Sequence, residues 1–393
     1  MRKSLIALAL ALGCAGSAGA VEVTLPDAGL RLQVYGYIKA DLSHDTQNTA
    51  PGSDFTFYVL PEVAGEKDGQ TRLAARESRF GLNLFGPDVG AWKTTGKIEL
   101  DFYGGGNPNS YNPRIRLAYV DVARSCGLSL RFGQDWDTFT EVTPRINNFA
   151  YLADVGALGL RRPQARATKE IKFTDNTKLV VKVAAAQTVG QDLDGGGQDD
   201  GADADWPTAQ FNVALHQKLW TEKAARLAFS GHYGRETIDS VDSNKVVVAT
   251  DTADFDTWSA QASIFLPICK MVAVQGNLWQ GANLDTYYGG IGQGVNMARG
   301  EEIEAKGGWA QLLFDPTDKW AFGLGYSVDD PCDEDLVGNK TQMSKNDLVW
   351  FYGAYKFTAA LTAMAEYSQM TTDYAGKDDA TNDRVQVSMK YTF

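Results

Sequence analysis

The feature that most constrains the fold is a strict alternation of apolar and polar side chains that recurs along the chain. It is clearest at the end, where Val385, Val387, Met389, Tyr391 and Phe393 alternate with polar residues. Successive side chains of a β-strand point to opposite faces, so the pattern predicts a strand with one apolar and one polar face. Alternation and turn residues together indicate about sixteen such strands along the chain.

The connections between these strands alternate in length, long and then short. Ser125-Cys126-Gly127 is one of the short turns, whereas the stretch from Thr140 to Pro163 is long. Transmembrane barrels have this asymmetry, with short periplasmic turns and long outer loops. In hydrocarbon every backbone amide must be paired, so a sheet survives there only if it closes. The sequence therefore predicts an all-β fold, a transmembrane antiparallel up-and-down β-barrel.

A soluble β-sandwich is the alternative, because a half-buried sheet gives similar alternation. It would not give the regular loop asymmetry, and it seldom uses this many strands. Aromatic residues near strand ends would form girdles at the two membrane interfaces; they are Trp136, Trp220, Trp258, Trp320 and Tyr391.

The start of the chain has the pattern of an export signal. Arg2 and Lys3 precede an apolar core, Ser4 to Gly13, and small residues lead to Ala20. We expect cleavage after Ala20, with lipid attachment at Cys14 as the alternative. This gives a signal peptide over 1–20 and a transmembrane β-barrel over 21–393, which we expect to be exported to an outer membrane.

Composition supports one large β-unit. A length of 393 residues is ordinarily a prior for two or three domains, but the 40 glycines and 11% aromatic residues suit a single barrel. The net charge of −12 makes nucleic acid an improbable partner. Cys126, Cys269 and Cys332 are an odd and scattered set, which argues against a disulfide framework.

The long stretch Thr140–Pro163 mixes charged with apolar residues. A solvated surface loop need not be that apolar, so we predict that it folds back into the lumen and narrows it. The alternative is an external loop packed on its neighbours. Its charged residues are Glu141, Arg145, Asp154, Arg161 and Arg162.

Several segments resemble the Gram-negative outer-membrane porins and, more narrowly, the DcaP-type porins. They are VYGYIKADL (Val34–Leu42), RESRFGLN (Arg76–Asn83), IELDFYG (Ile98–Gly104), RIRLAYVDV (Arg114–Val122), FGQDWDTF (Phe132–Phe139) and VQVSMKYTF (Val385–Phe393). The resemblance implies a homotrimer of 16-stranded barrels, each narrowed by its third long loop, here Thr140–Pro163. DcaP-type proteins can carry a helical N-terminal extension, whereas only a short segment separates Ala20 from the first expected strand at Leu30.

The polar faces of the early strands are charged and net basic, and those of the later strands are mostly neutral. Charge at a constriction biases which solutes pass, and arginine suits carboxylates because its planar fork makes two bonds at once. We therefore predict a water-filled channel for passive diffusion of small hydrophilic solutes, favouring small anions. The resemblance points to dicarboxylates or aromatic acids. The predicted constriction consists of Arg79, Arg114, Arg116, Arg131 and Arg166 on the wall and Glu141, Arg145, Asp154, Arg161 and Arg162 in the loop.

Three alternatives stay open. The arginines could merely pair with carboxylates of the wall and loop, the pore could be a non-selective general diffusion porin, or the barrel could be a non-conducting adhesin or structural barrel. An enzyme is not expected, although Ser230 beside His232 invites comparison with an outer-membrane phospholipase, because neighbours on one face do not make a triad.

No cofactor is expected, and the expected partners are outer-membrane lipid, lipopolysaccharide, further copies of the chain and small polar or anionic solutes. The acidic loop Asp192–Asp205 faintly resembles a calcium loop, but it lacks the EF-hand order of ligands. Its alternative interpretation is a solvated acidic loop. The glycine-rich stretch around Gly289–Gly294 is interpreted as a flexible outer loop, because it lacks the strand and helix of a nucleotide loop.

Overall fold

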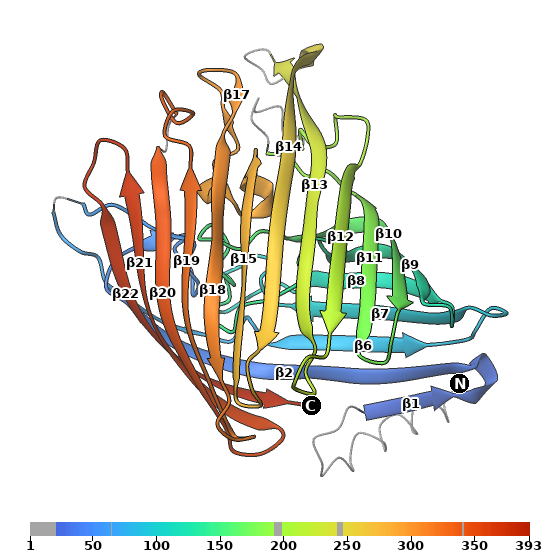
Figure 1. Cartoon of the computed structure of the whole chain (residues 1–393). Coiled ribbons are helices and arrows are strands. Elements are labelled where there is room, and N and C mark those ends of the chain that lie inside the picture. Colours follow the sequence, from blue (N-terminus) through green and yellow to red (C-terminus); the bar gives the residue numbers. More distant parts are fainter. Residues whose placement is uncertain (1–20, 64, 192–198, 242–246, 340–341) are drawn as a thin grey trace.

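The computed structural model describes residues 21–63, 65–191, 199–241, 247–339 and 342–393, and it shows a closed antiparallel barrel (Figure 1). The predicted signal peptide, residues 1–20, lies outside the described residues. Sixteen strands form the wall. They are β2 (Leu30–Asp45), β6 (Arg79–Phe85), β7 (Lys93–Asp101), β8 (Arg114–Ala123), β9 (Leu128–Trp136), β10 (Arg161–Lys172), β11 (Thr177–Ala186), β12 (Thr208–Gln217), β13 (Ala225–Val241), β14 (Val247–Pro267), β15 (Val272–Ala282), β18 (Glu304–Phe314), β19 (Trp320–Pro331), β20 (Met343–Lys356), β21 (Leu361–Tyr374) and β22 (Ala380–Thr392).

The barrel closes where the last strand pairs with the first. β22 pairs antiparallel with β2 from Tyr37↔Thr392 to Asp45↔Arg384. β5 (Gln70–Ala74) pairs with the last part of β2, and β6 pairs with the first part. These two short strands together form the neighbour of β2 on this side of the barrel. β1 (Val21–Leu25) pairs with the start of β2. The predicted strand count and closure are confirmed.

The remaining elements are short. They are strands β3 (Thr49–Ala50), β4 (Tyr58–Val59), β16 (Val295–Asn296) and β17 (Glu301–Glu302) and the 3₁₀ turns η1 (Pro26–Ala28), η2 (Asp285–Tyr287) and η3 (Gly290–Gly292). Within the described ranges no helix is long and apolar enough to span a membrane.

The two ends of the barrel differ, as predicted. Both termini of the described chain and the short turns lie at one end, and the long loops lie at the other (Figure 1). The long connections used below are loop L1 (46–78), loop L3 (137–160), loop L4 (187–207) and loop L6 (283–303). The predicted third loop ends earlier than expected, because Arg161 already pairs with Trp136 in the wall. Arg161 and Arg162 therefore belong to β10 and not to the loop.

The wall has one apolar and one polar face. On β22, the outward Val387 and Tyr391 are 43% and 52% exposed, whereas the inward Arg384 and Gln386 are each 2% exposed. Outward apolar residues recur on the other strands, including Phe80, Phe132, Phe229, Leu278 and Phe351. This is the alternation that the sequence predicts.

One aromatic residue departs from the predicted girdle. Trp136 lies in the lumen and not on the outer face, and it lines a cavity beside L3. It is the last residue of β9, and the chain turns into the lumen directly after it, so its side chain follows the backbone inward. Trp220 and Trp320 are exposed, as is Tyr391.

Loop L3 crosses the lumen, which confirms the inward interpretation. Polar wall side chains hydrogen-bond to its backbone along the way. Ser230 and Gln261 donate to the Phe139 carbonyl at 3.2 and 3.0 Å, and Gln275 donates to the Thr143 carbonyl at 3.0 Å. Farther along, the Arg145 backbone exchanges two bonds with Gln311, at 2.8 and 2.6 Å.

The apolar residues of L3 explain why a loop can lie there. Val142, Leu152 and Val155 are buried against the inner side of the late strands, in one cluster with Trp309 and Trp350. Backbone groups of a buried loop must find partners, and here Gln, Ser and Asn side chains supply them. The neutral wall predicted from the late strands is therefore the surface on which L3 docks.

Candidate functional site: the constriction

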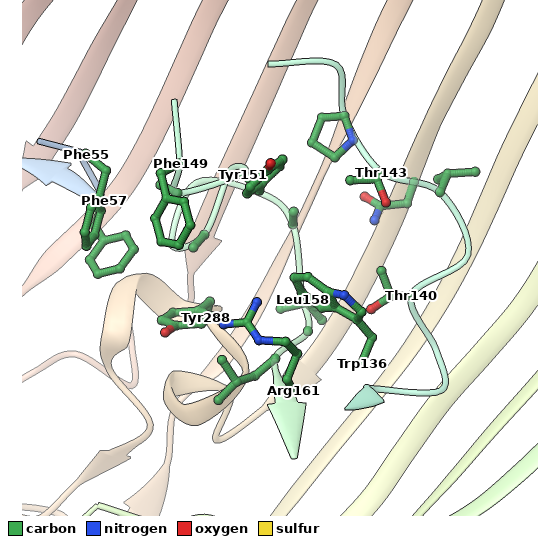
Figure 2. Close-up of a pocket in the computed structure, with 18 of the residues that line it drawn as sticks. Phe55, Phe57, Trp136, Thr140, Thr143, Phe149, Tyr151, Leu158, Arg161 and Tyr288 are labelled. Atoms are coloured by element: carbon green, nitrogen blue, oxygen red, sulfur yellow. The ribbon is translucent and has the colours of Figure 1, made fainter. Parts of the chain in front are cut away.

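The narrow part of the lumen contains a cavity of about 220 Å³ between L3 and the wall of β8 and β9. Figure 2 shows its lining side chains. L1 supplies Phe55 and Phe57, L6 supplies Tyr288, and L3 supplies Phe149 and Leu158; the β-wall adds Trp136, Arg114, Arg116 and Arg161. Four separate parts of the chain therefore build one cavity.

Two of the lining arginines are neutralised by carboxylates. Arg114 forms a two-pronged contact with Asp101, with its Nε and Nη2 at 3.1 and 2.9 Å from the two oxygens. Arg116 is fully buried and bridges two acids, with Nε 2.9 Å from Glu99 and Nη1 2.8 Å from Asp101. Charge-assisted bonds of this geometry fix both side chains against the wall.

Arg161 differs from them. Among the described residues its guanidinium makes no ion pair or hydrogen bond. It makes a cation–π contact with Trp136, with Cζ 4.6 Å from the centroid of the ring. Figure 2 shows the side chain extending between Trp136 and Tyr288. The like charges that repel its guanidinium most strongly are Arg116 and Arg114. Three arginines thus line this cavity. The two acids beside them, Glu99 and Asp101, are already paired with Arg114 and Arg116, so Arg161 is left without an acidic partner.

The opposite side of the cavity is a run of aromatic rings. Phe149 stacks on Tyr103 at 3.8 Å, and Phe55 lies 5.6 Å from Phe149 and 5.0 Å from Phe57. Phe57 in turn lies 5.5 Å from Tyr288. Aromatic pairs at these separations are favourable, so the run is a stiff apolar surface facing Arg161.

The other wall arginines predicted for the constriction do not line this cavity. Arg131 pairs with Asp121 at 2.7 Å and with Asp135 at 2.6 Å, and Arg166 also contacts Asp135 at 2.6 Å. Arg79 lies 3.8 Å from Glu99, and its Nε and Nη2 are buried without hydrogen-bond partners. Pairing, the alternative interpretation, thus accounts for most of the predicted ladder.

Two charged residues near the start of L3, Glu141 and Arg145, anchor the loop to the wall. Glu141 is surrounded by Lys182 at 3.1 Å, His216 at 3.4 Å and Arg226 at 3.9 Å. Arg145 pairs with Asp315, in the short turn between β18 and β19, at 2.6 Å. These contacts hold L3 across the lumen and leave neither charge in the cavity lining.

Two further predicted residues are buried beside the loop. Arg162 contacts Asp137 at 2.9 Å and lies 4.0 Å from the Tyr287 ring, so it joins the root of L3 to L6. Asp154 is buried with its Oδ1 unpartnered, and burial, reinforced by Asp329 and Asp285, raises its pKa well above the usual range. Of the ten predicted site residues, Arg114, Arg116 and Arg161 line the cavity.

The aromatic half of the site was missed from the sequence. Phe55 and Phe57 begin the short apolar run Phe55–Leu60 in an otherwise polar loop, and that run is a signal that could have marked them. Tyr288 lies in the stretch interpreted as a flexible outer loop, and that interpretation is wrong. The carbonyls of Tyr287 and Tyr288 accept hydrogen bonds from Gly159 and Asp154 of L3, both at 2.9 Å, so L6 is packed against L3.

Two weaker sequence motifs have structural explanations or lie outside the described chain. Residues 192–198 of the acidic loop Asp192–Asp205 lie outside it, and the described residues contain no group of three or more His, Cys, Asp or Glu side chains arranged for a metal. His232 bonds to Ser259 at 2.7 Å and Thr257 at 3.1 Å, while Ser230 bonds to L3.

A closed sixteen-strand barrel narrowed from inside by its third long loop is the fold of the outer-membrane porins. Solved structures share it. The outer membrane channel DcaP of Acinetobacter baumannii is 18% identical, with a TM-score of 0.73 over 96% of this chain and 100% of that one. The anion-selective porin from Comamonas acidovorans is 13% identical, with a TM-score of 0.61 over 93% of this chain and 100% of that one.

OmpT of Vibrio cholerae is 12% identical, with a TM-score of 0.57 over 95% of this chain and 100% of that one. No protein-family model and no curated protein matches the sequence. At these identities the likeness shows the fold, and it bears out the porin resemblance of the sequence at that level.

Proposed function

We propose that the protein is an outer-membrane porin, a water-filled channel for passive diffusion of small hydrophilic solutes, and that it favours small carboxylate anions with an apolar body. The observation that carries the anion preference is Arg161, a guanidinium in the constriction with no acidic partner among the described residues. An unpaired arginine in a narrow, partly dehydrated space can bind a carboxylate through two parallel bonds.

The aromatic run supplies the second half of the preference. A solute held at Arg161 would lie against Phe57, Phe149 and Tyr288, which offer apolar surface and no charge. Aromatic acids and dicarboxylates with a hydrocarbon spacer fit this combination of one cation and a ring-lined wall. The names of two solved relatives in fold, an outer membrane channel and an anion-selective porin, agree with the proposal.

The overall charge of −12 acts against anion entry, but only at long range. Surface charges are screened beyond about 10 Å in ordinary salt. The local balance at the constriction, where Arg161 is added to two arginines and two acids already paired, therefore decides selectivity.

Reversal potentials in planar bilayers under a KCl gradient test the proposal. We expect wild type to prefer chloride, and Arg161→Gln to lose most of that preference while it still conducts. The matched control is Arg299→Gln, which removes an exposed arginine of L6 paired with Glu301 at 2.9 Å and should leave selectivity unchanged. A cation preference that Arg161→Gln does not alter would contradict the anion preference, and a barrel that does not conduct would contradict the channel.

The proposed assembly is a homotrimer embedded in outer-membrane lipid and lipopolysaccharide. OmpT of Vibrio cholerae, which shares the fold, has a solved trimer form. The outward apolar residues of the wall suit contact with lipid or with another barrel. The mass of the native complex in mild detergent distinguishes three chains from one.

A further inference from the structure

A second cluster of polar side chains lies above the constriction, where β13, L4 and L6 meet. Glu236 comes from β13, and Asn283 and Asp285 come from the start of L6. All three are buried, Glu236 and Asn283 completely. They are distinct from the residues that line the cavity.

Two of these three side chains have buried polar atoms without hydrogen-bond partners, whereas Oδ1 of Asp285 accepts a hydrogen bond from the Thr286 backbone at 2.6 Å. Both carboxylate oxygens of Glu236 are buried without a hydrogen-bond partner, and so are the oxygen and nitrogen of the Asn283 amide. Native proteins pair nearly all buried polar atoms, and a buried carboxylate without a partner is among the costliest exceptions. Four such atoms side by side point to a missing ligand rather than to isolated defects.

The charges around Glu236 have one sign. The charged side chains that act on it most strongly are Asp285, Asp200 and Asp199, and all three are acidic. L4 lies directly over this position, because the Asp200 carbonyl accepts a hydrogen bond from the Thr237 backbone at 3.1 Å. None of the groups that act most strongly on Glu236 is cationic, and the one among them that favours its charged form is the neutral amide of Asn283.

The backbone holds the oxygen atoms in place. The Asn283 N–H donates to the Ile303 carbonyl at 3.1 Å, and its own carbonyl accepts from Thr257 at 2.7 Å. Oδ1 of Asn283 and Oδ2 of Asp285 both lie within 2.7 Å of the point where a Cβ of Gly294 would stand. They are therefore close enough to contact one ion, and only glycine at 294 leaves them room.

We infer that Glu236, Asn283 and Asp285 bind a divalent cation, with calcium the best match. Calcium takes six to eight oxygen ligands from carboxylates, amide carbonyls and water at 2.3–2.6 Å. Two carboxylates from separate segments and one amide oxygen supply that chemistry, and water completes the shell. The site lies toward the long-loop end of the barrel, and it joins L6 to the wall beside Tyr287 and Tyr288.

Terbium and calcium titrations of the full barrel, folded in detergent and free of lipopolysaccharide, test this inference. Terbium replaces calcium, and the neighbouring tyrosines should sensitise its emission. We expect one saturable site per barrel, displacement by CaCl₂, and an unfolding temperature that falls by a few degrees in EDTA. Glu236→Gln and Asp285→Asn should each weaken calcium binding by about tenfold or more, since ligand charge sets affinity at such sites.

Glu304→Gln is the control, because Glu304 is an exposed acid at the same end of the barrel and should bind calcium as wild type does. Either ligand variant suffices if the other does not fold. Unchanged calcium affinity in a folded Glu236→Gln or Asp285→Asn barrel would overturn the inference. So would a wild-type barrel that neither sensitises terbium nor responds to EDTA, which would mean that protons neutralise the acids instead. Neither readout depends on conduction, so the channel proposal and this one can fail separately.

Discussion

The two sides of the lumen face the same interior, but one borders the open cavity and the other supports loop L3. The wall of β8 and β9 carries arginines and acids and borders the open cavity. The wall from β13 to β21 carries mostly neutral side chains and is covered by L3. Inward orientation alone therefore does not make a residue part of the pore. What distinguishes the two sides is whether water or a folded loop lies against them.

The largest expected effect comes from breaking the covered side. Trp350 is fully buried under L3, and its Nε1 donates to the Arg145 carbonyl at 3.1 Å. Trp350→Ala should lower the free energy of unfolding by about 3–5 kcal/mol, because it leaves a large cavity beneath the loop. It should also make the single-channel current larger and noisier, since L3 loses its support.

Urea unfolding in lipid vesicles measures the first effect. Phe351→Ala is the matched control, because Phe351 is the next residue of the same strand, points outward and is 50% exposed. Phe351→Ala should lower the free energy of unfolding much less than Trp350→Ala does, and it should leave the single-channel current unchanged. Equal losses in the two variants would mean that L3 does not rest on this wall.

A somewhat smaller effect separates two arginines of the open side. Arg116→Ala should destabilise the barrel by about 3 kcal/mol or more, because Glu99 and Asp101 are left buried with less compensation. Arg161→Gln should leave the free energy of unfolding within about 0.5 kcal/mol of wild type, since this substitution leaves no buried carboxylate unpaired. Unfolding midpoints of both variants decide. If Arg161→Gln costs as much as Arg116→Ala, Arg161 has a structural partner and the proposed solute contact is wrong.

The strands and the direction of L3 could be predicted because their causes are local. Alternation along β22 predicts which side chains face out. The apolar content of L3 predicts that the loop is buried against the rest of the protein. The state of each arginine could not be predicted in the same way. Arg116 is paired because a register shift between Glu99 and Leu100 brings it to both acids, and a shift of this kind leaves no clear mark in the sequence.

The aromatic half of the site was beyond prediction for a related reason. Phe57 and Tyr288 are far apart in the chain and meet only because L1 and L6 both fold toward the lumen. Trp136 illustrates the limit of parity, which fails at the last residue of a strand, where the backbone leaves the sheet. Sequence patterns thus identify the two walls, whereas the long loops decide which wall is open.

The smallest expected effect concerns Asp154, at the point where L3 meets the covered wall. In the fold its pKa lies well above that of the unfolded chain, so the native state holds a proton that the unfolded state releases once the pH exceeds about 4. Stability therefore falls as the pH rises from there toward the native pKa, because it is unfavourable to ionise a buried carboxyl of which one oxygen has no hydrogen-bond partner. Asp154→Asn removes this penalty and should raise stability at pH 8 by about 1 kcal/mol or more, with the gain vanishing near pH 4. Unfolding midpoints of both proteins across this pH range measure it, and a gain that does not depend on pH would show that the side chain is not protonated in the fold.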